Sequence, residues 1–159
     1  MTSLQEIEAL AHCGLRGDRY ADPRNRKSPD YQVTLIEIEL IERFSKAHRL
    51  PLAPYEPRRN LVTTGVPLNE LHGKRILVGE VELKALELCE PCLLFSRRTH
   101  REVVRYFAHR GGLRCSIVRG GIIRLGDSVR QRIEQPAYRS RGASRCAGQH
   151  RPGRNEGED

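Results

Sequence analysis

Two cysteines, Cys89 and Cys92, flank a Glu-Pro pair in the stretch ELCEPCLLF, residues 87–95. Cysteine thiolates act as nucleophiles and as metal ligands, so this spacing admits several kinds of chemistry. A structural zinc site, a redox dithiol, a single thiolate kept for an external ligand, and a pair of small buried residues are all compatible with it. The spacing alone does not rank a functional interpretation above burial.

Two of these interpretations lack part of their usual pattern. A structural zinc site takes four Cys or His ligands, normally as two close pairs. Here a second pair is absent from the sequence, and Cys115, His100 or His109 would have to complete the set. A redox dithiol normally opens a helix, whose dipole lowers a thiol pKa. The residues after Cys92, LLFSRR, are predicted to be extended, with the next helix beginning only at Thr99.

The third interpretation makes one thiol a single ligand for a redox-active metal or for transferable sulfur, with a cofactor supplying the rest of the site. Neighbouring arginines would favour the thiolate and bind an anionic cofactor. The arginines available for this role are Arg58, Arg59, Arg97, Arg98 and Arg110.

The composition indicates what kind of protein contains these cysteines. The 159 residues are 38% hydrophobic and 30% charged, which fits one globular domain. The formal charge of +8 suits anionic partners. The N-terminus carries acidic residues where a secretory signal has positive charge, and no apolar run reaches the ~20 residues of a membrane helix. Together with five cysteines, an odd number, this predicts a cytoplasmic protein without a disulfide framework or a membrane anchor.

Short strands are predicted to dominate the first 133 residues. Val81, Leu83 and Ala85 share one face of a strand that includes VELKALEL. Leu86 and Leu88 then have the opposite parity, which predicts a β-bulge near Ala85, just upstream of the cysteines. The predicted strands cover residues 33–36, 60–66, 75–88, 113–118 and 122–129.

Two helices and one shorter turn are predicted among these strands. Helical spacing of apolar residues covers residues 36–50. A second helix is expected from Thr99, capped through Glu102, to the following pair of glycines, and the turn is expected at residues 67–74. The fold class predicted is mainly β, a closed or nearly closed barrel with two or three peripheral helices. Residues 134–159, rich in Arg and Gly with almost no aliphatic side chains, are predicted to be a disordered tail after a domain formed by residues 1–133.

Five segments, in order, resemble the MOSC domain, named for the C-terminal domain of molybdenum cofactor sulfurases. The resemblance covers roughly residues 13–133. It implies a β-barrel and a cysteine that, in family members, coordinates the molybdenum of the pterin cofactor or is proposed to carry transferable sulfur. The segments are GLRGDRYAD (14–22), QVTLIEIELIERF (32–44), RRNLVTTGVPLNELHGKRILVGEVELKALELCEPC (58–92), HRGGLRC (109–115) and GGIIRLGDSV (120–129).

The resemblance also assigns site residues. The family's cysteine falls on Cys92, and Cys89 is assigned a supporting position or the role of a resolving thiol. The family's Arg-Asn element falls on Arg59 and Asn60, with Arg58 beside it as a further arginine for the anionic cofactor. Its Gly-Asp element falls on Gly17 and Asp18, although Gly-Asp is also ordinary turn chemistry. The implied roles of these motif residues are cofactor contact and shaping of the site.

The sequence departs from the family pattern in two respects. Members have a strand ahead of the Gly-Asp element, whereas only sixteen residues precede Gly17, in a segment that could form a short helix. Whether the first strand is present, and whether the barrel closes, is therefore left open. The chain shows no pyridoxal phosphate-binding domain, so any sulfur donor is expected to be a separate protein.

The hypothesis drawn from the sequence is a protein that binds molybdenum cofactor, or sulfur destined for it, through Cys92. If catalytic, it would be a molybdenum-dependent oxidoreductase or would transfer sulfur. Expected partners are the anionic pterin cofactor and a separate sulfur donor or electron-transfer protein. Two alternatives stay open: a Cys-x-x-Cys redox protein, and a basic nucleic-acid-binding module, which the 5% aromatic content disfavours.

Overall fold

The computed structural model describes residues 3–25 and 28–133. The predicted tail, residues 134–159, lies outside the described residues. The elements are β1 (Glu6–Leu10), β2 (Gly14–Leu15), η1 (Arg19–Ala21), η2 (Pro23–Asn25), β3 (Val33–Glu37), α1 (Ile38–His48), β4 (Leu61–Thr63), η3 (Leu68–Leu71), β5 (Arg75–Val78), β6 (Val81–Leu88), α2 (Leu93–Arg98), α3 (Glu102–Phe107), β7 (Leu113–Arg119), β8 (Gly121–Arg124) and β9 (Val129–Gln131).

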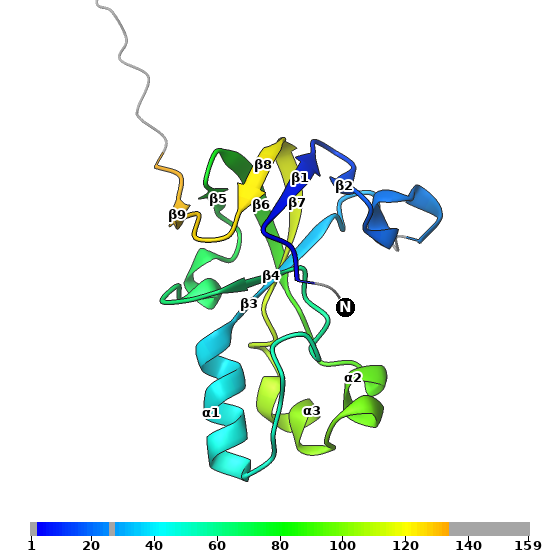
Figure 1. Cartoon of the computed structure of the whole chain (residues 1–159), viewed down its shortest axis with the longest axis vertical. Coiled ribbons are helices and arrows are strands. Elements are labelled where there is room, and N and C mark those ends of the chain that lie inside the picture. The colour runs from blue at the N-terminus through cyan, green and yellow to red at the C-terminus, as the bar shows by residue number, and fades with distance from the viewer. Residues whose placement is uncertain (1–2, 26–27, 134–159) are drawn as a thin grey trace, which may run out of the picture.

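The strands form two sheets at one end of the molecule, and the α-helices gather at the other end (Figure 1). A six-stranded sheet has the order β4-β3-β7-β6-β5-β9 and curls into a half-barrel, while a three-stranded sheet has the order β2-β1-β8. Neighbouring strands are antiparallel except β3 and β4, which are parallel. The predicted mainly-β fold with peripheral helices is confirmed.

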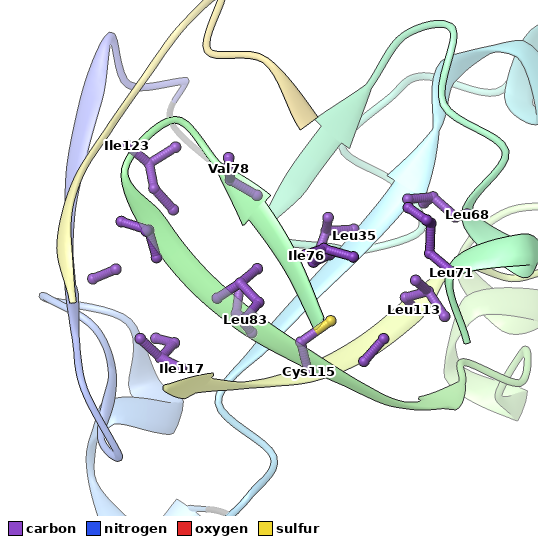
Figure 2. Close-up of a cluster of buried hydrophobic side chains, with 14 of the residues drawn as sticks. Leu35, Leu68, Leu71, Ile76, Val78, Leu83, Leu113, Cys115, Ile117 and Ile123 are labelled. Atoms are coloured by element: carbon purple, nitrogen blue, oxygen red, sulfur yellow. The ribbon is translucent and has the colours of Figure 1, made fainter. Parts of the chain in front are cut away.

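The main core lies between the curled sheet and the small one (Figure 2). On β7, Leu113, Cys115 and Ile117 are buried while the residues between them are partly exposed, because successive side chains of a strand face opposite sides. Ile123 of β8 joins this cluster from the other sheet. A second apolar cluster lies among the helices, centred on Phe44.

The predicted bulge in β6 is present. Ala85 is paired with Cys115 of β7, but Glu87, two residues further along β6, is paired with Arg114, which is only one residue before Cys115 in the antiparallel β7. The extra residue on β6 shifts the parity of everything that follows it. The bulge therefore sets the direction in which the chain leaves the sheet toward the two cysteines.

The segment ahead of Gly17 forms a strand, so its description as a short helix is wrong. β1 pairs with β8 over four residue pairs and with β2 on its other side. Ala9 is buried in the core from this strand. The pairing supplies backbone hydrogen bonds that β8 would otherwise lack, which a short helix could not do.

The extended conformation predicted for LLFSRR is also wrong, because these residues form α2. Phe95 is buried and packs against Phe107 of α3, with ring centroids 5.6 Å apart. Tertiary packing of this kind stabilises helices too short to form alone. The helix expected from Thr99 begins later, at Glu102, because the Thr99 hydroxyl donates to the Phe95 carbonyl (2.7 Å) at the end of α2.

The helix predicted at residues 36–50 is confirmed as α1, and the turn at residues 67–74 contains η3. In the part of the chain that the structure describes, every helix is too short or too polar to cross a bilayer.

Candidate functional site

The two cysteines lie in the short connection between β6 and α2, which is fixed to the start of β7. The Cys89 backbone N–H donates to the Gly112 carbonyl at 2.7 Å. Gly112 has a φ of 105°, and a Cβ there would overlap the Leu35 carbonyl oxygen of β3. A Cβ at Gly111 would likewise overlap the Cys89 carbonyl oxygen. We call the connection between β6 and α2 the cysteine loop. The glycine pair allows the chain before β7 to lie against both this loop and β3.

Cys92 is exposed and directly precedes α2 in extended backbone conformation. Its carbonyl accepts a hydrogen bond from the Ser96 N–H (3.2 Å), which starts the helix, but its side chain does not cap that helix. Among residues 3–25 and 28–133, no group forms a hydrogen bond with the Cys92 thiol. The thiol is thus available to an external ligand.

The other thiols near the site are in different environments. Cys89 and Cys115 are both fully buried. Burial raises the pKa of the Cys89 thiol, an effect that the positive charges of Arg59 and Arg114 oppose. Burial also raises the pKa of Cys115 well above its ordinary value. Both side chains are therefore neutral thiols near pH 7. Cys115 packs in the main core.

The structure removes one objection to a redox dithiol and supplies another. Since α2 begins directly after Cys92, the sequence-based objection that no helix follows the pair is removed. The burial of Cys89 and its raised pKa oppose the dithiol interpretation instead, because thiol exchange requires an accessible thiolate.

Arg59 braces the cysteine loop. Its Nε donates to the Gly111 carbonyl at 3.0 Å and its Nη2 donates to the Glu90 carbonyl at 3.4 Å. One side chain from the segment before β4 thus holds both the loop between the cysteines and the chain entering β7. The structure places Arg59 against the backbone beside Cys92, and also leaves its positive charge close enough to influence Cys89.

Asn60 connects the Gly-Asp element to the sheet. Its Oδ1 accepts from the Thr34 backbone N–H (2.9 Å) and from the Thr34 hydroxyl (2.8 Å). Its Nδ2 donates to Asp18 Oδ2 at 3.2 Å, and Asp18 Oδ1 accepts from the Tyr20 N–H at 2.8 Å. Gly17, exposed with a φ of 79°, turns the chain into this link. The structure therefore brings Asp18 and Asn60 together.

Arg58 faces a different feature, an open hollow of about 360 Å³. The hollow is also lined by Arg98 from the end of α2, and by Tyr55, Glu56 and Thr99. Within the described part of the chain, no carboxylate forms an ion pair with Arg58 or Arg98. Two unpaired guanidinium groups give this hollow the donors that a phosphate or carboxylate requires.

The remaining candidate arginines are not grouped with these two. Arg97 is exposed on the last turn of α2. Arg110 donates to the Tyr106 carbonyl (2.6 Å) and its guanidinium lies 4.7 Å from the centre of the Tyr106 ring. The structure therefore offers Arg58 and Arg98 as a pair, and not the full set of five.

Sequence reasoning missed two residues that hold the motif residues in place, Glu90 in the cysteine loop and Thr34 beside Asn60. Glu90 accepts from the His109 backbone N–H (3.0 Å to Oε2) and contacts His109 Nδ1 (2.9 Å), so it ties the loop to the chain after α3. Thr34 anchors Asn60 as described above. Neither has a local signal. The second helix was predicted to end at Gly111 and Gly112, but it ends at Phe107, and the two glycines instead allow the close backbone approach.

In the described ranges, no three His, Cys, Asp or Glu side chains are grouped so that they could hold a metal ion. A metal bound at Cys92 would therefore take further ligands from a cofactor.

A family model identifies the family, and solved structures show the same fold. Residues 22–130 match the family model of the MOSC domain. The structure is similar to that of the YuaD protein from Bacillus subtilis, with a TM-score of 0.69 and 18% identity over 80% of this chain and 85% of that one. It is also similar to YiiM from Escherichia coli (TM-score 0.60, 18% identity, 82% of this chain and 63% of YiiM).

A third similar structure is YiiM from Geobacillus stearothermophilus, with a TM-score of 0.58 and 13% identity over 65% of this chain and 55% of that protein. Identities this low show a shared fold and nothing finer. None of the curated proteins matches the sequence at a significant level.

Proposed function

Because this chain belongs to the MOSC domain family, we propose that it binds the molybdenum cofactor, or a sulfur atom destined for that cofactor, through the thiol of Cys92. The observation that carries the proposal is the contrast among the thiols near the site. Cys92 is exposed and uncapped beside a rigidly held backbone, whereas Cys89 and Cys115 are buried and held protonated. A ligand arriving from solvent can reach only the first of these three.

The residues present fit such a group. A soft thiolate suits molybdenum, and the pterin's dithiolene sulfurs would complete the metal's soft ligands. The unpaired guanidinium groups of Arg58 and Arg98 would bind its phosphate as bidentate partners. When bound, the cofactor would supply a redox centre that this chain's own side chains do not provide.

The other motif residues hold the site in shape. Arg59 and Glu90 fix the loop that presents Cys92, and Asn60 fixes Asp18 against β3. A group that is already held in its binding position loses less conformational freedom on binding, so these contacts would reduce the ordering cost of binding. Cys89, buried behind the loop, contributes packing.

The test uses full-length protein produced in a host that makes molybdenum cofactor. Wild type, Cys92→Ser and the control Cys13→Ser are compared for molybdenum content, for pterin fluorescence and, after incubation with a sulfur donor, for persulfide. Wild type and Cys13→Ser should hold cofactor or persulfide, and Cys92→Ser should lose it. The proposal is wrong if none of the three proteins holds either group under conditions that load a known carrier, or if Cys92→Ser loads as well as wild type.

A second variant distinguishes binding of the cofactor from binding of sulfur alone. Arg58 has a φ of 57°, so Arg58→Asn removes the charge while keeping a residue that tolerates this backbone conformation. If the cofactor is bound, Arg58→Asn should lower molybdenum content. If only sulfur is carried, the persulfide yield should be unchanged by this substitution.

A further inference from the structure

Arg58 and Arg98 share their open hollow with an aromatic ring and a carboxylate. The hollow has a volume of about 360 Å³, and Tyr55 and Glu56 also line it. Small-molecule sites have volumes of roughly 300–1,000 Å³, so the hollow is large enough for a ligand of more than a few atoms. A phosphate alone would use only the two guanidinium groups, which leaves the ring and the carboxylate for another part of the same ligand.

The Tyr55 ring is exposed and has no stacking partner in the part of the chain that the structure describes. Tyr55 is 61% exposed. The other described tyrosines, Tyr20, Tyr31 and Tyr106, each have an arginine guanidinium over the ring, at 4.1–4.7 Å from its centre. Across residues 3–25 and 28–133, neither a guanidinium nor another ring lies over Tyr55. A flat ring entering the hollow can therefore stack on Tyr55.

Glu56 keeps one carboxylate oxygen for a ligand. Its Oε2 accepts from the Ala53 backbone N–H at 2.5 Å, which holds the side chain beside its own turn. Among the described residues, nothing donates to Oε1 and no cation forms an ion pair with this carboxylate, although Arg58 and Arg98 line the same hollow. A carboxylate only accepts hydrogen bonds, so a ligand at Glu56 must bring N–H or O–H donors.

The turn that carries Tyr55, Glu56 and Arg58 has a defined shape without a ligand. The Glu56 N–H donates to the Ala53 carbonyl (3.0 Å), and the Arg58 N–H donates to the Tyr55 carbonyl (3.1 Å). Arg58 has a φ of 57°, a left-handed conformation that residues other than glycine rarely adopt. Backbone of this kind is concentrated at functional sites, and a turn that is already ordered lowers the cost of binding.

The end of α2 forms another wall of the hollow. Arg98 is the last residue of α2, and His100 Nε2 lies 2.9 Å from the Pro51 carbonyl oxygen, which joins the chain after α2 to the segment before the turn. The six residues of α2 begin directly after Cys92 and span about 9 Å at 1.5 Å per residue. A molecule that is bound at Cys92 and also enters the hollow must span about this distance.

We propose that the hollow selects a phosphate-bearing heterocycle with a 2-amino-4-oxopyrimidine edge, which pterins and guanine share. Arg58 and Arg98 bind the phosphate, the Tyr55 ring stacks on the heterocycle, and Glu56 Oε1 accepts from the adjacent N–H and NH₂ donors of the edge. Adenine has an acceptor nitrogen at the position of that N–H, so the carboxylate disfavours adenine. The inference rests on the proposed function for the role of the two arginines, and it names the residues that recognise the organic part of the ligand.

The experiment uses full-length protein from a host that cannot make molybdenum cofactor, and measures dissociation constants by isothermal titration calorimetry. GMP, IMP and AMP have the same ribose phosphate and differ in the ring edge. Guanosine lacks the phosphate of GMP, and inorganic phosphate lacks its ring. The phosphate ester of 6-hydroxymethylpterin carries the same edge as GMP on a pterin, so the two probes distinguish the two sources of that edge.

The variants each remove one contact. Glu56→Gln keeps an amide oxygen for the Ala53 N–H but turns a donor toward the ligand. Tyr55→Ala removes the ring, and R58N/R98Q removes the two charges. The matched controls, which remove the same charges outside the hollow, are Glu42→Gln and R97Q/R105Q. Cys92→Ser is included because the proposed function depends on Cys92 and binding in the hollow alone does not.

Wild type should bind GMP and the pterin phosphate at least about tenfold more tightly than AMP, with IMP between them because it lacks the 2-amino donors. Guanosine and inorganic phosphate should each bind more weakly than GMP. Glu56→Gln should lose most of the preference for GMP over AMP. Tyr55→Ala should weaken binding of every probe that has a ring, and R58N/R98Q binding of every probe that has a phosphate. Cys92→Ser and both controls should bind as wild type.

Equal binding of GMP, IMP and AMP, or an unchanged preference in Glu56→Gln, would overturn the assignment of the edge. Undiminished GMP binding in both Tyr55→Ala and R58N/R98Q would show that the ligand binds outside the hollow. If no probe binds wild type while Cys92 still loads with cofactor or persulfide, this inference alone fails. If the probes bind as expected but Cys92 never loads, the proposed function fails and the hollow is still a site for this class of phosphate.

Discussion

At the scale of single residues, differences in burial give the four described cysteines different accessibility to reagents. Cys92 is exposed, Cys13 is partly buried with its thiol 3.3 Å from the Ala21 carbonyl oxygen, and Cys89 and Cys115 are fully buried. The spacing of Cys89 and Cys92 could not reveal this difference, because it depends on the turn that the chain makes after the β6 bulge.

Alkylation of the native protein should follow this order. At pH 7.5 iodoacetamide should modify Cys92 first, at a rate ~10-fold or more above that of Cys89 and Cys115, because a buried thiol with a raised pKa is neither accessible nor ionised. Peptide mapping by mass spectrometry gives each rate. In urea all three should react alike. Rapid modification of Cys89 or Cys115 in the native state would contradict the site described here.

Asn60 is the second residue whose role the structure defines. Replacing it with alanine removes bonds to Thr34 and Asp18 in a partly buried position, and should lower the free energy of unfolding by about 1–3 kcal/mol. Asn69→Ala is the matched control, since that exposed amide donates one hydrogen bond, to the His109 carbonyl. Urea denaturation measures both variants. Equal losses would show that Asn60 is not a special anchor.

At the scale of elements, the glycines before β7 decide whether β3, β6 and β7 can meet. Gly112→Ala combines a positive φ with overlap on the Leu35 carbonyl, and should destabilise the protein by more than about 3 kcal/mol. Gly65 also has a positive φ but open space around its Cα, so Gly65→Ala should cost only about 1 kcal/mol. Chemical denaturation of the two variants tests this, and similar costs would mean that the close approach is not required.

The elements also show where the sequence was informative. Parity along VELKALEL predicted the bulge because a strand's side-chain period is two, and any extra residue must show in it. The sequence LLFSRR could not be assigned in the same way. It is too short to show helical periodicity, and its helix depends on Phe95 meeting Phe107 from another element.

At the scale of the whole molecule, a buried carboxylate links β5 and β6 to the chain that follows β9, the edge strand of the half-barrel. Glu82 of β6 is almost fully buried and receives hydrogen bonds from Arg132, just after β9, and from Arg75 of β5. These bonds hold the pKa of Glu82 below its ordinary value, Arg132 contributing most. The stability they add is present above the unfolded pKa of about 4.3, and is lost as the pH falls through the lower folded value.

Glu82→Gln should therefore destabilise the protein by about 1–3 kcal/mol at pH 7. The difference from wild type should narrow as the pH falls below about 4, where Glu82 itself becomes protonated. Urea denaturation across a pH series measures it. Glu87→Gln, which breaks the more exposed pair with Arg114, should have a smaller effect. If the loss of unfolding free energy in Glu82→Gln does not change with pH, the ion pairs of Glu82 do not provide this stability.

The contacts among the site residues also depend on the fold of the whole molecule. The motif residues could be named from the sequence, but their contacts could not: Asp18 and Asn60 are joined across 42 positions, and Arg59 reaches Gly111 across 52. Such contacts depend on strand order, and strand order is not a local property. For the same reason, the separation of Arg58 from Arg59, one facing the hollow and the other the cysteine loop, emerges only in the folded chain.

Cys92 is the one cysteine proposed to bind the ligand. The most direct test is peptide-resolved mass spectrometry of protein purified from a host that makes molybdenum cofactor, with thiols left free in the native state trapped before digestion. We expect Cys92 to be protected or to carry additional sulfur, and Cys13 to be trapped unmodified. A Cys92 that is fully free in every preparation, or additional sulfur located on Cys13 instead, would contradict this expectation.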